Sequence, residues 1–187
     1  MNFKESIKDY LHNEKTIIDS LDIDVINRIM NEILESQNRG NTIYICGNGG
    51  SAATASHYCC DFNKGVSGQQ HKNTNFVCLS DNIPTMTAIA NDLSYDEIFS
   101  YQLKNRLKKG DLLFVISGSG NSKNIIRAME VAKEKGNRII GLCGYSGGKV
   151  KEMSDTCLHV DVNNMQIVED IHMVLDHCMM YILSCLN

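Results

Sequence analysis

The sequence predicts an α/β protein whose five-stranded parallel sheet is flanked by helices on both faces, in three layers. Short, continuous apolar runs, typical of strands buried on both sides, alternate with longer segments whose apolar residues recur at helical spacing. Two of these runs end in Gly- and Ser-rich turns that lead into predicted helices. No repeat or composition change marks a boundary, so residues 1–187 are expected to form one domain.

Composition and charge exclude several classes of protein. A chain of 187 residues, 43% hydrophobic and 21% charged, can bury one sizeable core. Its net charge of −4 and its lack of a dense Lys/Arg cluster argue against a nucleic-acid partner. The mixed-charge N-terminus does not resemble a signal peptide, and no apolar stretch reaches the ~20 residues that cross a bilayer. Eight cysteines without a CxxC motif favour free thiols in a reducing compartment, so a cytoplasmic location is expected.

The elements follow in order along the chain. Residues 2–38 have the apolar spacing of two amphipathic helices, broken near residues 20–24, and Gly40 follows where a left-handed cap is favoured. The α/β core then spans residues 42–187. The continuous apolar runs predicted as strands are 43–46, 76–79, 112–116, 138–143 and 157–162. Further helices are predicted in the Ala-rich segment after Ser51 and over 85–90, 95–109, 124–135, 150–153 and 168–186.

The chain is organised around the stretch 42–61. The apolar run 43–46 stops at the turn Gly47–Ser51, and an Ala-rich helix follows. Backbone N–H groups and the positive end of a helix dipole meet at such a turn, which suits a phosphate.

The turn Ser117–Ser122 is a second cradle of the same kind. Glycines let the backbone approach a ligand, and three hydroxyls can donate to phosphate oxygens. Alone, it could equally be an ordinary loop with a helix N-cap at Asn121 or Ser122. Paired with the first turn at another strand end, it favours a phosphate site. No GxxxxGK[ST] motif predicts a nucleoside triphosphate site, and no acidic residue follows Gly47-x-Gly49 at the distance that a dinucleotide requires.

Titratable residues gather on two predicted helices. His57 and Asp61 are four positions apart and so share a helix face. The apolar terminal helix carries five such groups, Glu169, Asp170, His172, Asp176 and His177. Burying them unpaired would be expensive. Two interpretations stay open: a salt-bridged interface between subunits, or a shared site of two histidines and two carboxylates from the two helices.

Together these motifs resemble the SIS (sugar isomerase) domain family, and within it the bacterial phosphoheptose isomerases. The motifs that carry the resemblance are Cys46–Ser51, His57-x-x-x-Asp61, Asn91-Asp92, Ser117-x-Ser119-Gly120-Asn121-Ser122, Gly144-x-x-Gly147-Gly148, and Glu169–His172 with His177. They occur in the family's order and approximate spacing over the whole chain.

The resemblance implies an aldose–ketose isomerase that converts sedoheptulose 7-phosphate to D-glycero-D-manno-heptose 7-phosphate through an enediol. It implies Asp61 as the base and His177 as the acid, in a homotetramer with active sites at subunit interfaces. The substrate contacts that it implies are Asn48, Gly49, Gly50, Ser51, Asp61, Asn91, Asp92, Ser117, Gly118, Ser119, Ser122 and Glu169. The metal ligands that it implies, for one zinc ion per subunit, are His57, Asp61, Glu169 and His177.

The chain departs from the family's pattern at three positions. Asp61 stands where Glu is usual and is one methylene shorter. Glu169 stands where Gln is usual, which makes a metal site more anionic, and Gly118 stands where Thr is usual, which leaves a looser phosphate site. The alternatives are an isomerase of a different sugar phosphate and a non-catalytic branch that binds the replication initiator. The initiator-binding branch lacks an acidic residue at the position of Asp61.

Overall fold

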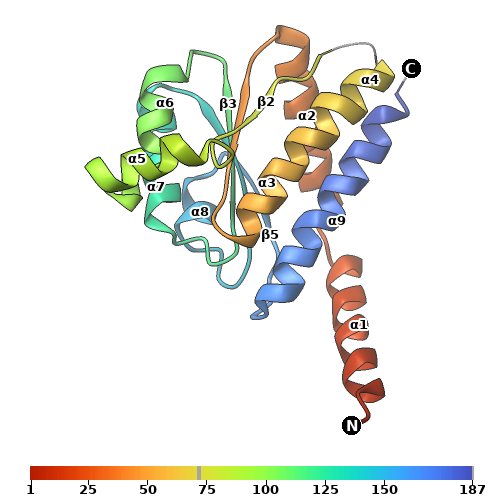
Figure 1. Cartoon of the computed structure of the whole chain (residues 1–187). Helices are drawn as coiled ribbons and strands as arrows, with labels where there is room; N and C mark the ends of the chain where they lie inside the picture. The colour runs from red at the N-terminus through yellow and green to blue at the C-terminus, as the bar shows by residue number, and fades with distance from the viewer. Residues whose placement is uncertain (71–72, 187) are drawn as a thin grey trace.

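A computed structural model describes residues 1–70 and 73–186. Within them, five parallel strands form one sheet in the order β2-β1-β3-β4-β5 (Figure 1). The strands are β1 (Ile43–Cys46), β2 (Phe76–Cys78), β3 (Leu112–Ser117), β4 (Arg138–Cys143) and β5 (Thr156–His159). The helices are α1 (Lys4–Asp19), α2 (Ile23–Arg39), α3 (Gly50–Cys60), η1 (Asp61–Val66), α4 (Ser67–Gln70), α5 (Ile83–Asp92), η2 (Tyr95–Glu97), α6 (Ser100–Arg106), α7 (Lys123–Glu134), α8 (Gly148–Met153) and α9 (Met165–Ser184).

Helices cover both faces of the sheet, as the sequence predicts. Successive strand residues point to opposite faces, so Ile43 and Ile45 pack in one core while Tyr44 and Cys46 pack in the other. The first core lies under α2, α3, η1 and α9, and the second under α5, α6, α7 and α8. Burial on both faces explains why the strands are continuous apolar runs.

The strand order reverses at β1, which pairs with β2 on one side and β3 on the other. Cys46 at the end of β1 is level with Val115 near the end of β3. The turns that follow these two strands therefore leave the same edge of the sheet side by side. Ligands of open parallel sheets bind at this kind of switch point.

Most predicted helices are confirmed, and Gly40 has the expected left-handed backbone, with φ 69°. The predicted helix 95–109 is divided into η2 and α6, which stops at Arg106. One reason is Lys135, whose ammonium donates to the carbonyl oxygens of Leu103, Lys104 and Leu107 and so satisfies the end of α6. None of the described helices is long and apolar enough to cross a membrane.

Two helices differ from the helices that the sequence predicts, and both differences affect the site. The Ala-rich helix α3 continues without a break into a π-helical segment, η1, which begins at Asp61. Such segments often mark functional positions because they rotate the side chains that follow. The terminal helix α9 begins at Met165, three residues earlier than predicted, because the Asn164 side chain accepts hydrogen bonds from the amides of Gln166 and Ile167.

Candidate functional site: an anion hollow and a His/Asp group

The turns after β1 and β3 enclose a hollow of about 180 Å³. Its lining residues are Asn48, Ser51, Ile116, Ser117, Gly118, Ser119, Ser122, Met165 and Glu169. The turn Ser117–Ser122 thus contributes all four of its predicted contacts to the lining, and the turn Gly47–Ser51 contributes Asn48 and Ser51.

Two helix N-termini meet at this hollow. Helix α3 begins at Gly50 and α7 at Lys123, and neither has a side-chain cap among the described residues. By contrast, α2, α5 and α9 are each capped by an Asp or Asn side chain. In the first turns, the Ala52 amide of α3 donates to the Gly49 carbonyl at 3.1 Å and the Ile125 amide of α7 to the Asn124 side chain at 2.9 Å. The positive ends of the two helix dipoles lie at the hollow, which suits an anion.

The serine turn is held in place by the loop 144–148. The Gly144 amide donates to the Gly118 carbonyl at 2.8 Å, and the Val150 amide donates to the Gly120 carbonyl at 3.0 Å. Gly120 has a φ of 66°, and a Cβ there would meet the Gly147 backbone. The Gly-rich loop 144–148 therefore packs against the serine turn and fixes its position.

Two residues that the sequence did not single out shape the hollow: Met165 lines it, and Asn124 holds the lining residue Asn48. Asn124, 2% exposed, exchanges side-chain hydrogen bonds of 2.8 and 2.9 Å with Asn48. A Cβ on Gly118 would lie 2.6 Å from the sulfur of Met165, so Met165 fills the space that a threonine would need. The hollow is therefore not made looser by glycine at position 118.

Five predicted contacts lie outside the lining of the hollow, and one of them, Asp61, belongs to a group of side chains between α3/η1 and α9. Gly49 and Gly50 are exposed beside it, at the start of α3. Asn91 and Asp92 are the exposed last residues of α5, where the Asn91 amide donates to the Asp92 carboxylate at 2.9 Å. Within the described part of this chain, Asn91 and Asp92 do not reach the hollow.

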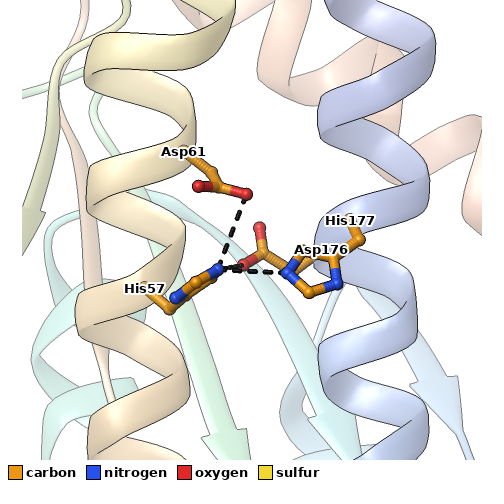
Figure 2. A group of neighbouring side chains, drawn as sticks. All are labelled: His57, Asp61, Asp176 and His177. Carbon is orange, nitrogen blue, oxygen red and sulfur yellow. Dashed lines mark hydrogen bonds and ion pairs between the residues drawn. The ribbon is translucent and has the colours of Figure 1, made fainter.

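A second group of side chains lies between α3/η1 and α9. His57, Asp61, Asp176 and His177 each offer one ligand atom, and these atoms all lie within 4.8 Å of one another (Figure 2). The two Nε2 atoms of His57 and His177 are 3.1 Å apart. His57 Nε2 is 3.7 Å from Asp61 and 3.9 Å from Asp176, measured to Oδ2 of each. Two histidines and two carboxylates from facing helices thus form one group.

Glu169, predicted as a metal ligand, is not a member of this group, and Asp176 is present instead. The reason is the parallel course of α3 and α9, which Figure 1 shows. Glu169 precedes His177 by eight residues, about 12 Å along the helix axis. It is level with the start of α3, where its carboxylate would lie 2.6 Å from a Cβ on Gly50. Glu169 therefore faces the hollow rather than His57.

Burial sets the protonation of two acid–base groups on α9. Asp176 is 0% exposed. Burial first, and then the charge of Asp61, raise the pKa of Asp176 to about 8. His172 is also 0% exposed, and burial lowers its pKa to about 4, opposed by the backbone of Cys143. His172 is thus a neutral core residue and is not a member of the His/Asp group.

The group fits a divalent metal ion. Two imidazoles and two carboxylates are donors that zinc accepts, and four donors suffice for a tetrahedral site. Neither Asp176 oxygen has a hydrogen-bond partner within the described residues, which leaves both free to coordinate. The chemistry of the donors and their spacing therefore both suit a zinc-like ion.

These features define a class of protein: a parallel α/β protein that presents two uncapped helix N-termini at its switch point. The model of the "SIS domain" family matches residues 4–144. The chain is 35% identical over 180 residues to the phosphoheptose isomerase of Aliarcobacter butzleri, with 95% of each chain covered. It is 37% identical over 170 residues to a probable phosphoheptose isomerase of Thermoplasma acidophilum, with 91% and 93% covered.

Solved structures agree with this similarity. The phosphoheptose isomerase GmhA from Neisseria gonorrhoeae superposes with a TM-score of 0.90 at 27% identity, over 99% of this chain and 100% of that one. The chain therefore belongs to the SIS-domain family, in its phosphoheptose isomerase branch.

Proposed function

We propose that this protein is an aldose–ketose isomerase that converts sedoheptulose 7-phosphate to D-glycero-D-manno-heptose 7-phosphate. The observation that carries the proposal is the meeting of two uncapped helix N-termini at one serine-lined hollow, which suits a phosphate. The relatives named as phosphoheptose isomerases supply the sugar. In this assignment Ser117, Ser119 and Ser122 hold the phosphate, and Asn48 and Ser51 contact the middle of the substrate.

The reaction requires two proton transfers. One proton leaves C1 of the ketose and is delivered to C2, and another moves from the C1 hydroxyl to the C2 oxygen, through an enediol. We assign the carbon transfer to Asp61, whose carboxylate is partly exposed between α3 and α9. We assign the proton transfer between the two oxygens to His177, whose Nε2 lies 3.1 Å from His57 Nε2 in the same His/Asp group. Each general acid–base residue typically contributes about 10²–10⁴-fold.

The proposal includes a zinc ion, one per subunit. His57, Asp61 and His177 would hold it together with a carboxylate of α9, which the family pattern places at Glu169. When bound, such an ion supplies Lewis-acid polarisation of a carbonyl oxygen. Its other consequence is electrostatic, because a dication offsets the negative charge of the carboxylates beside it.

We also propose a homotetramer with active sites at subunit interfaces, located in the cytoplasm. The exposed position of Asn91 and Asp92 supports the assembly, because a neighbouring subunit could bring them to the hollow that they do not reach within one chain. The free cysteines of the described chain are consistent with a reducing compartment; they are Cys46, Cys59, Cys60, Cys78, Cys143, Cys157, Cys178 and Cys185.

An aldose/ketose assay over a panel of C5 to C7 sugar phosphates, with and without chelator, tests this function. Sedoheptulose 7-phosphate should be turned over best. Asp61→Asn and His177→Ala should each lower kcat by about 10²–10⁴-fold. His12→Ala, on the exposed face of α1, is the matched control and should leave kcat unchanged.

Two outcomes would contradict the proposal. Full activity in both Asp61→Asn and His177→Ala would refute the acid–base assignment. A folded protein that turns over none of the sugar phosphates would refute the isomerase and favour a binding protein of the same fold.

A further inference from the structure

Asp176 has no role in the family's pattern, yet its surroundings call for a partner. The side chain is 0% exposed, and within the described chain neither carboxylate oxygen makes a hydrogen bond. A buried carboxylate without a partner costs several kcal/mol. It points from α9 toward η1 and α3, into the group drawn in Figure 2.

The two imidazoles lie within hydrogen-bond distance of each other, and the spacing of the whole group is also close to that of a metal site. Zinc bonds of 2.0–2.2 Å in a tetrahedron place neighbouring ligand atoms about 3.3–3.6 Å apart. The three distances from His57 Nε2, 3.1 Å to His177, 3.7 Å to Asp61 and 3.9 Å to Asp176, bracket that range. The two longer distances exceed the ordinary hydrogen-bond range, so the carboxylates are near His57 without being bonded to it.

Charge leads to the same conclusion. Asp61 and Asp176 offer oxygens within 4.8 Å of each other, and within the described residues the ion-pair partner of each is His57. A divalent cation would bind both carboxyl groups and give the buried Asp176 the partner that it lacks.

We propose that Asp176, rather than Glu169, is the α9 carboxylate that ligates the divalent metal, together with His57, Asp61 and His177. This inference rests on the proposed function only for the expectation of a metal. Glu169 remains at the hollow, level with Gly50. The four ligands then come from both α3/η1 and α9, so the ion ties the two helices together.

The inference is tested by metal binding, without reference to turnover. Metal-free wild-type protein and the variants Asp176→Asn and Glu169→Gln are titrated with Zn²⁺ against a chromophoric chelator. Loss of an outer-sphere partner lowers metal affinity by 10–100-fold, so loss of a ligand in Asp176→Asn should lower it by at least about 100-fold. Glu169→Gln, the matched carboxylate-to-amide change on the same helix, should bind Zn²⁺ as the wild type does.

Two further measurements keep the test sharp. The melting temperature of the wild type should rise when Zn²⁺ is added, and the rise should vanish in Asp176→Asn but persist in Glu169→Gln. The visible spectrum of bound Co²⁺ should change in Asp176→Asn alone. Metal-free Asp176→Asn should fold, because asparagine has nearly the same size and shape as aspartate, and circular dichroism checks this.

Three results would overturn the inference. They are Zn²⁺ binding by Asp176→Asn that equals the wild type, a larger loss in Glu169→Gln, and no Zn²⁺ binding by the wild type. In the last case an active wild type would leave the proposed isomerase intact, so failure of the metal assignment and failure of the function are distinguished.

Discussion

Gly120→Ala should loosen the phosphate cradle by a predictable amount. Alanine at a φ of 66° costs about 1 kcal/mol in backbone strain. The new Cβ would also lie 2.6 Å from the Gly147 carbonyl carbon, so the serine turn must move away from the loop 144–148. That movement breaks the bonds of Gly120 and Gly118 to the Val150 and Gly144 amides, each worth about 1 kcal/mol. The total loss in free energy of unfolding should be about 3 kcal/mol.

Gly136→Ala is the matched control for this prediction. Gly136 has a similar φ of 71°, but a Cβ there would meet nothing within 4 Å. Its substitution should therefore cost only the strain of about 1 kcal/mol. Urea unfolding measures both losses, and KM for the sugar phosphate should rise in Gly120→Ala alone. Equal losses in the two variants, or an unchanged KM in Gly120→Ala, would refute the reasoning that the loop 144–148 positions the cradle.

Two further predictions concern α9 and its neighbours. The pKa of His172 is about 4 in the folded chain, against an ordinary value of 6.5, so the unfolded chain binds the proton more readily. The free energy of unfolding should therefore fall by about 3 kcal/mol as the pH drops from 6.5 to 4. His172→Leu should remove that part of the acid sensitivity in urea midpoints measured across this window, and an unchanged slope would count against it. Gly50→Ala should leave the melting temperature unchanged or slightly raised, because alanine favours a helix, while it displaces the Glu169 carboxylate and lowers kcat/KM on the order of 10–100-fold. Wild-type kcat/KM in that variant would show that the position of Glu169 does not matter.

Much of this protein follows from local sequence patterns. Continuous apolar runs predict strands because a parallel sheet buries both faces, and the five predicted runs correspond to β1–β5. The turns at Gly47–Ser51 and Ser117–Ser122 both follow predicted strands, which favours a shared phosphate site, and β1 does lie beside β3. The spacing of His57 and Asp61 placed them on one helix face, and their atoms are 3.7 Å apart.

Other features depend on how distant segments pack. Periodicity cannot show where α9 lies along α3, and that relation decides that Asp176, rather than Glu169, joins His57. The π-helical turn at Asp61 and the pairing of Asn124 with Asn48 are likewise set by packing, as 76 residues separate the two asparagines. The sequence by itself therefore determined the elements and the chemical groups that they carry. Only the tertiary structure decided which carboxylate faces which histidine, because a helix presents its side chains all around and its neighbours select among them.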